Sequence, residues 1–279
     1  EEKISELYPP QADVIKKGLF RERNLILSLP TASGKTFIAT VAMIHNLLER
    51  KGTKVVYISP LVALSYEKYR YFKNFFDKDF KVAISVGDLD SSDPRLAEYD
   101  VIVCTTEKLE SLLRHNISWT NKVGLIIVDE IHMLNDSSRG PTLEILLTKL
   151  MKIVPRAQIL GLSATISNAD ELARWLNAAL VVSDFRPVKL YEGVSFDSKI
   201  HFDEKDGYEL NESEDVENAI IQNTLELNKQ ALVFTSTRKN AESLAERLCK
   251  TVKLKLKKDD QYKLDSLYKE VENVLEYPT

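Results

Sequence analysis

The chain has 279 residues, of which 44% are hydrophobic and 29% are charged, and its formal net charge is −4 at pH 7. This composition is ordinary for a globular protein, and no apolar stretch approaches the roughly 20 residues that span a bilayer, so we expect a cytoplasmic protein without a membrane partner. The acidic balance argues against binding nucleic acid through bulk positive charge, although backbone N–H groups can also hold phosphates.

Short apolar, β-branched runs alternate with helical patterns over the first two thirds of the chain. The predicted strands are residues 24–29, 54–59, 82–86, 101–105, 124–128 and 158–162. The predicted helices are residues 10–20, 35–49, 61–76, 107–115, 142–153 and 169–176. This alternation predicts an α/β fold in which helices flank a parallel sheet, within a first domain of residues 1–185.

The pattern changes after residue 185. Residues 186–215 begin as an extended stretch and end in an acidic segment with few large apolar residues, so we predict a linker and a surface loop. A second domain, residues 216–279, is predicted from a helix at 216–227, a strand at 231–235 and helices at 238–248 and 262–275. It is too small to match the first domain, and we expect it to be incomplete.

Two cysteines, Cys104 and Cys249, lie far apart in apolar or helical contexts. Because their spacing does not match a metal site, we expect reduced packing residues. The lysines between residues 250 and 258 form a basic run, which is typical of a solvated helix face.

The segment 30–36 (PTASGKT) follows an apolar run and opens a helical pattern, which is the order that a phosphate-binding loop requires. The loop backbone and the helix N-terminus can hold a β-phosphate, Lys35 would reach the β- and γ-phosphates, and Thr36 would bind Mg²⁺. The general pattern has glycine where this chain has Leu29. The residues predicted to bind the nucleotide here are Leu29, Pro30, Thr31, Ala32, Ser33, Gly34, Lys35 and Thr36.

Asp129 and Glu130 follow the apolar run 123–128, so they should lie at the carboxyl end of a buried strand, where ligands bind in parallel sheets. Asp129 would hold Mg²⁺ together with Thr36, while Glu130 would orient and deprotonate the attacking water. Either motif alone could be an ordinary helix start or cap. Together they predict nucleotide hydrolysis with Lys35, Asp129 and Glu130 as catalytic residues.

Eight short segments in order resemble the motifs of superfamily-two DNA helicases, in the branch of the archaeal Hjm type and of the helicase domain of eukaryotic polymerase theta. They are residues 8–11 (YPPQ), 30–36, 59–64 (SPLVAL), 85–88 (SVGD), 105–108 (TTEK), 129–132 (DEIH), 162–165 (LSAT) and 234–238 (FTSTR). The resemblance covers most of the chain. It implies one RecA-like domain with a P-loop and a DEAH-like box, part of a second RecA-like domain, and an ATP-dependent helicase of 3′ to 5′ direction in DNA repair or recombination.

The resemblance also assigns roles to single residues. Gln11 would read the adenine edge of ATP, and Ser163 and Thr165 would couple the nucleotide site to the nucleic-acid site through His132. The residues that would hold backbone phosphates of single-stranded or forked DNA are Pro60, Leu61, Ala63, Leu64, Thr105, Thr106, Lys108, Thr235, Thr237 and Arg238. Taken singly, each is also explained as an ordinary helix cap, and Val62 stands where the family usually has a basic residue.

Complete members of this family also carry late motifs whose arginines face the γ-phosphate, and no segment after Lys250 matches them. We therefore expect an N-terminal fragment that acts as a monomer, binds ATP and DNA, hydrolyses ATP weakly and does not unwind by itself, nucleoid-associated if archaeal. An RNA-remodelling helicase of the same branch and a nucleotide-dependent nucleic-acid-binding module without turnover remain alternatives. A phosphotransferase is disfavoured, and replication or repair partners are not specified by the sequence.

Overall fold

The computed structural model describes residues 6–87, 93–115, 117–210, 215–255 and 258–274. It divides into two compact units, residues 1–189 and 190–279. None of the helices in these described ranges is long and apolar enough to cross a bilayer.

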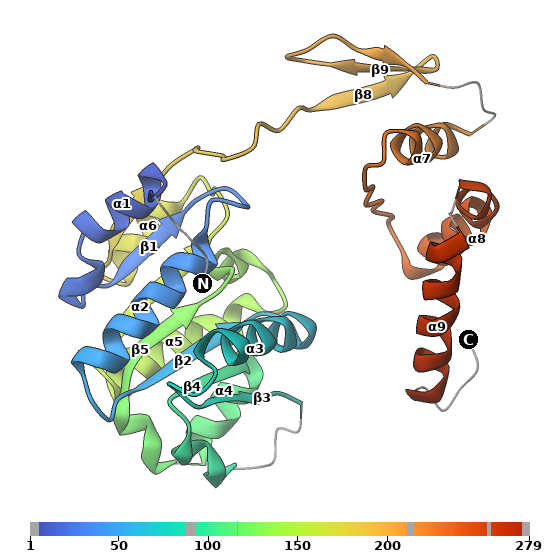
Figure 1. Cartoon of the computed structure of the whole chain (residues 1–279). Helices are drawn as coiled ribbons and strands as arrows, with labels where there is room; N and C mark the ends of the chain where they lie inside the picture. Colours follow the sequence, from blue (N-terminus) through green and yellow to red (C-terminus); the bar gives the residue numbers. More distant parts are fainter. Residues whose placement is uncertain (1–5, 88–92, 116, 211–214, 256–257, 275–279) are drawn as a thin grey trace. The chain divides into compact units, whose positions relative to one another are not determined.

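The first unit is built on a seven-stranded parallel sheet in the order β3-β4-β2-β5-β6-β1-β7 (Figure 1). Its strands are β1 (Leu25–Ser28), β2 (Lys54–Ser59), β3 (Val82–Ser85), β4 (Val101–Thr105), β5 (Val123–Val128), β6 (Gln158–Ser163) and β7 (Ala179–Val182). The six predicted strands are confirmed. β7 is additional, because the segment that was expected to close the domain pairs with β1 along its whole length.

Helices cover both faces of this sheet. They are α1 (Pro9–Lys16), α2 (Lys35–Glu49), α3 (Val62–Phe76), α4 (Thr106–Arg114), α5 (Gly140–Ile153) and α6 (Ala169–Trp175). Successive strand side chains point to opposite faces, so Leu25 and Leu27 join one core cluster with α1, α2 and α3, whereas Ile26 joins another with α4, α5 and α6. The five strands β1, β2, β4, β5 and β6 are buried at every position, as both covered faces require.

Where the structure describes it, the second unit begins with a three-stranded antiparallel sheet and continues with three helices. Its elements are β8 (Gly193–Phe196), β9 (Lys199–Phe202), β10 (Tyr208–Glu209), α7 (Val216–Glu226), α8 (Arg238–Lys255) and α9 (Lys258–Val274). β8 and β9 form a hairpin around Asp197 and Ser198, which both take positive φ. The prediction of an extended linker and a loop for this region is therefore wrong in its secondary structure, since a tight two-residue turn folds the extended stretch back on itself.

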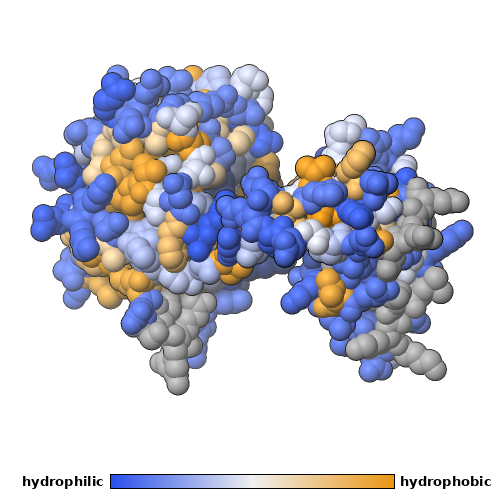
Figure 2. Space-filling model, turned by 90° about the horizontal axis from the view of Figure 1, so that it is seen from above, coloured by the Kyte–Doolittle hydropathy of each residue, from blue (hydrophilic) through white to orange (hydrophobic). Residues whose placement is uncertain are grey.

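The strand predicted at residues 231–235 is also wrong, because these residues are irregular. Leu232 is 80% exposed and Phe234 is 87% exposed. A parallel strand needs a neighbour for its N–H and C=O groups, and no strand among the described residues pairs with this segment. Apolar patches (orange) interrupt the hydrophilic surface of both units in the view of Figure 2.

Candidate active site

The loop between β1 and α2 lies at the carboxyl edge of the sheet. Ala32 and Gly34 take positive φ of 63° and 87°, which turns the backbone sharply before α2 begins at Lys35. Gln11 lies against this turn, since a Cβ on Gly34 would come within 2.3 Å of Gln11 Nε2. Tyr8 N donates a hydrogen bond to Gln11 Oε1 over 2.9 Å, which fixes the amide orientation. The structure thus joins the predicted Gln11 to the predicted phosphate-binding loop.

Lys35 points back into the same loop. Its Nζ donates to Leu29 O over 2.8 Å and to Pro30 O over 3.0 Å, and Ser33 Oγ donates to Pro30 O over 2.7 Å. Burial lowers the pKa of Lys35, while the charges of Glu130 and Asp129 act in the opposite direction. The ammonium group therefore sits between the loop carbonyls and the two carboxylates, where a phosphate could compete for it.

Asp129 and Glu130 follow β5 directly, as predicted. Asp129 N extends the sheet by donating to Ile58 O over 2.8 Å. Tyr57 OH donates to Asp129 Oδ2 over 2.6 Å, and Glu130 N donates to Asp129 Oδ1 over 3.1 Å. Burial raises the pKa of Tyr57 well above its usual value, and the charge of Asp129 adds to this. The phenol therefore stays protonated and holds the carboxylate in place.

Thr36 and Asp129 are the predicted magnesium ligands. A hydroxyl and a carboxylate suit Mg²⁺, which takes oxygen ligands and usually keeps several waters besides substrate phosphates. Among the described residues no group of three or more His, Cys, Asp or Glu could hold a metal by itself. A site that uses few protein ligands at the phosphate-binding loop fits this donor set.

His132 connects the two neighbouring strand ends. Its Nδ1 lies 3.4 Å from Glu130 Oε2 and 3.4 Å from Ser163 Oγ, at the end of β6. Glu130 takes a positive φ of 49°, which directs the chain from β5 into the turn that carries His132. The structure therefore places His132 and Ser163 together, as the predicted coupling requires. Thr165 is exposed, and its side chain makes no hydrogen bond within the described part of the chain.

The start of α3 presents free backbone donors at the same edge. Leu61 precedes the helix in an extended conformation, and no side chain caps the first turn. Leu61 is 41% exposed, and Pro60 to Leu64 are all exposed or half-buried. Because the first N–H groups of a helix have no intrahelical acceptor, this turn can bind a phosphate. A narrow pocket lined by Pro60, Thr106, Asp129 and Arg139 lies beside it.

The start of α4 is more buried than the start of α3. Thr105 Oγ1 accepts a hydrogen bond from Lys108 N over 3.4 Å, so Thr105 caps its own helix. Thr105, Thr106 and Lys108 are all buried, and the Lys108 side chain is only 2% exposed. Because Lys108 is buried, a phosphate at the start of α4 would be held by backbone N–H groups, as predicted for this helix start, and not by the Lys108 side chain.

In the second unit, the start of α8 is an exposed, self-capped turn. Thr237 Oγ1 accepts from Asn240 N over 3.1 Å, and Thr235 Oγ1 donates to Thr237 O over 3.0 Å. Thr235, Thr237 and Arg238 are all exposed. Their side chains are accessible to a ligand, as the prediction of a nucleic-acid contact requires.

Residues 8–172 match the model of DEAD/DEAH box helicases. The chain belongs to this family. It is 44% identical over 273 residues to the ATP-dependent DNA helicase Hel308 of Methanocella arvoryzae, a match that covers 96% of this chain and 37% of that relative. It is also 44% identical to the protein of the same name from Thermococcus kodakarensis, with 98% of this chain and 24% of the relative covered. The chain thus spans 24% to 37% of the length of these relatives.

Solved structures with the same fold include a crystal structure of the helicase MrfA, which superposes with a TM-score of 0.69 at 20% identity. This match covers 90% of the present chain and 39% of MrfA. At this identity the likeness supports the RecA-like fold of the DEAD/DEAH box helicase.

The structure adds site residues that no sequence motif indicated. Tyr57 lies within a buried strand, so nothing in its local pattern distinguishes it from a core residue. Arg186 Nη1 lies 3.5 Å from Thr31 Oγ1, and its charge lowers the pKa of Lys35. The rings of Phe185 and Tyr8 lie 5.2 Å apart. Residues 185 and 186 reach the loop because β7 pairs with β1, and recognising β7 as a strand would have predicted this.

Proposed function

We propose that this chain is the ATP-binding motor segment of a Hel308-type DNA helicase, which couples ATP hydrolysis to 3′ to 5′ movement on DNA. The observation that carries the proposal is the position of His132 between Glu130 and Ser163. His132 contacts Glu130, which is suited to activate water, and it also contacts Ser163 at the end of β6. The names of the relatives, ATP-dependent DNA helicases, support the same function.

The hydrolytic step follows from the side chains around the loop. Lys35 would exchange its contacts with the carbonyls of Leu29 and Pro30 for the β- and γ-phosphates. Glu130 would accept a proton from the attacking water, which then attacks the γ-phosphorus in line with the leaving β-phosphate oxygen. Mg²⁺, held by Thr36 and Asp129, would neutralise charge on the phosphates.

The product state would then change the contacts of His132. Loss of the γ-phosphate would free Glu130, and His132 Nδ1 could shift between Glu130 Oε2 and Ser163 Oγ, which are equally distant. Because Leu29 N donates to Ser163 O over 3.1 Å, the end of β6 is also tied to the phosphate-binding loop. These contacts connect Glu130 through His132 to the end of β6 and from there to the phosphate-binding loop.

The DNA would be bound through its backbone, as single-stranded or forked DNA, by the exposed turns at the starts of α3 and α8. Such contacts ignore the base sequence. We propose further that the chain acts as a monomer near the nucleoid, and that it hydrolyses ATP weakly and does not unwind by itself. Weak hydrolysis supposes that no arginine faces the γ-phosphate, because such an arginine is worth about 10³ to 10⁵ in turnover.

The proposal is tested by measuring ATP hydrolysis with and without single-stranded DNA, with RNA of the same sequence in parallel. Glu130→Gln serves as the control, since it keeps the side-chain shape but removes the base. Stimulation by DNA that Glu130→Gln abolishes is the expected result. Stronger stimulation by RNA would indicate an RNA-remodelling helicase, and ATP binding without any turnover would indicate a nucleotide-dependent binding module.

A further inference from the structure

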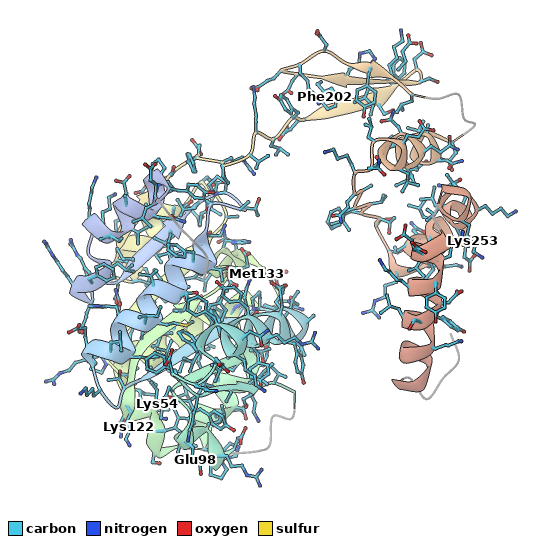
Figure 3. All side chains as sticks on the ribbon, viewed as in Figure 1. Lys54, Glu98, Lys122, Met133, Phe202 and Lys253 are labelled. Atoms are coloured by element: carbon cyan, nitrogen blue, oxygen red, sulfur yellow. The ribbon has the colours of Figure 1, made fainter. Side chains whose placement is uncertain are left out.

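A basic pocket opens at the edge of the first unit opposite the nucleotide site. It has a volume of about 540 Å³, and its lining includes Arg21, Arg23, Arg50 and Arg156. These arginines come from the loop before β1, the end of α2 and the loop before β6, which all lie at the amino ends of the strands. Figure 3 shows both edges, with Met133 at the carboxyl end and Lys54 and Lys122 at the amino end.

The backbone around this pocket is fixed by two amide side chains. Asn24 Nδ2 donates to Leu176 O over 2.9 Å, and Asn24 Oδ1 accepts from Ile159 N over 2.8 Å. Gln158, which is 2% exposed, donates from Nε2 to Arg23 O over 2.8 Å. The loop before β1 is thereby tied to β6 and to the turn before β7. The arginines therefore project from a preorganised frame, which limits the entropy that a ligand must overcome.

Positive charge dominates the pocket. Its one carboxylate, Glu22, lies 3.2 Å from Arg50 Nη1, so these two residues neutralise each other. Across the ranges that the structure describes, Arg21, Arg23 and Arg156 have no carboxylate within 4.0 Å. The first unit as a whole is nearly balanced, with 25 Lys and Arg against 23 Asp and Glu in residues 1–189, so these three guanidinium groups form a local excess of positive charge.

The chemistry of the lining selects an anion with several oxygen acceptors. A guanidinium group presents paired N–H donors that match a phosphate, and its charge persists at any physiological pH. The pocket is open and has an arginine-rich wall, which suits a linear polyanion passing across it. Its place on the edge opposite Asp129 separates it from the phosphates of a bound nucleotide.

We propose that this pocket binds the backbone phosphates of a nucleic-acid strand, as a second contact away from the starts of α3 and α8. This inference rests on the proposed function, because it assumes that the chain binds DNA. The DNA segment held at the amino edge of the β-sheet would differ from the DNA segment moved at its carboxyl edge. The pocket would therefore retain DNA while the motor contacts exchange.

The test compares the wild-type chain with the double variant Arg21→Gln and Arg156→Gln, both at exposed positions. The probe is a fluorescein-labelled oligodeoxythymidine of about 30 nucleotides, followed by anisotropy over a range of salt concentrations. We expect the double variant to bind about tenfold more weakly at low salt. The slope of log K against the logarithm of the salt concentration should become smaller by about 1.4, since each lost phosphate contact on a single strand contributes about 0.7. A control variant, Arg70→Gln with Lys78→Gln, removes two exposed charges on and just after α3, which are not part of the pocket lining, and should leave both values unchanged.

Three outcomes would overturn the proposal while leaving the proposed function intact. The first is an unchanged affinity of the double variant for the oligonucleotide, and the second is an equal loss of this affinity in the control variant. The third is a double variant that keeps its affinity for the oligonucleotide but binds inorganic pyrophosphate or polyglutamate more weakly than the wild-type chain. In the last case the ligand is a free phosphate compound or an acidic polypeptide. A wild-type chain that binds ATP but no DNA would overturn both proposals. ATP binding of each variant, measured in parallel, shows that the first unit is folded.

Discussion

The hydrogen bond from Tyr57 to Asp129 links a core side chain to the candidate metal site. Tyr57→Phe removes only the hydroxyl, so one Asp129 oxygen loses its donor while the ring packing is kept. We expect the Mg²⁺ concentration for half-maximal ATP hydrolysis to rise about tenfold, as is usual when the outer partner of a metal ligand is lost. The free energy of unfolding of Tyr57→Phe should be about 1 kcal/mol lower than that of the wild-type chain, which is the contribution of a typical hydrogen bond.

The matched control for this prediction is Tyr69→Phe on α3. Tyr69 is half-buried against the same core cluster but forms no hydrogen bond with a candidate metal ligand. Its magnesium dependence should stay at the wild-type value. If both variants shift the magnesium titration equally, the effect belongs to general packing and the Tyr57 hydroxyl does not position Asp129.

Lys35 gives a prediction for the dependence of ATP binding on pH. Burial lowers its pKa below the ordinary 10.5, so part of its charge is lost before the pH reaches that value. The unfolded chain binds more protons than the folded chain in this pH range. The cost of burying the charged Lys35 side chain therefore decreases, and the free energy of unfolding increases, as the pH rises. ATP favours the charged amine, and its affinity should therefore fall as the pH rises through the lowered pKa.

The pH dependence of ATP affinity is measured by titrating a fluorescent ATP analogue at a series of pH values from neutral up to the ordinary lysine pKa of 10.5. Lys35→Arg is the control, since a guanidinium group keeps its charge throughout that range. We expect a steeper loss of affinity in the wild-type chain than in Lys35→Arg. Parallel curves would show that Lys35 does not titrate in this window.

At the scale of elements, the turn before α2 depends on glycine for two separate reasons. Gly34 takes a φ of +87°, and a Cβ there would also lie 2.3 Å from Gln11 Nε2. Gly52 has a similar φ of +81° with nothing within 4 Å, so Gly52→Ala bears the backbone strain alone. Both alanine variants should lose about 1 to 2 kcal/mol of stability. Only Gly34→Ala should weaken ATP binding, by about tenfold or more, because it displaces Gln11.

The comparison needs thermal unfolding and ATP binding on the same two variants. Equal ATP affinities would mean that Gln11 does not depend on the close approach at Gly34. A loss of ATP binding in Gly52→Ala would show that backbone strain is transmitted along α2. Because both variants replace glycine by alanine at a positive φ, the comparison separates the effect of backbone strain from the effect of the contact with Gln11.

The elements that the sequence predicted are those with a local signal. β5 could be recognised because an unbroken apolar run is typical of a strand with both faces covered, and α2 because it follows a phosphate-binding pattern. β7 and the hairpin of β8 and β9 were missed, since their stability comes from a partner strand or a two-residue turn. The segment 231–235 has strand propensity but no partner among the described residues, and it is irregular.

The same distinction applies to the site. Lys35, Asp129 and Glu130 were predictable because their roles follow from residue type and position at a strand end. Tyr57 and Arg186 were not, because each reaches the site through the order of strands in the sheet. The burial of Lys108 could not be predicted either, because it depends on which face of α4 packs on the sheet.

At the scale of the whole molecule, the two compact units differ greatly in their cores. The first unit holds two extended clusters of buried residues around its sheet, whereas among the described residues of the second unit the buried apolar side chains are Leu210, Ala219 and Leu248. A domain that has its own core can fold alone. We therefore expect residues 1–189 to unfold cooperatively when expressed by themselves.

All the proposed ATP ligands lie in residues 1–189, as does Arg186 beside Thr31, so this segment should also bind a fluorescent ATP analogue within about twofold of the whole chain. Residues 190–279 serve as the control and should show neither ATP binding nor a sharp thermal transition, because their core is small. A segment 1–189 that is folded by circular dichroism but binds ATP far more weakly would contradict this assignment. It would mean that the second unit contributes to nucleotide binding as well as to the contact with DNA.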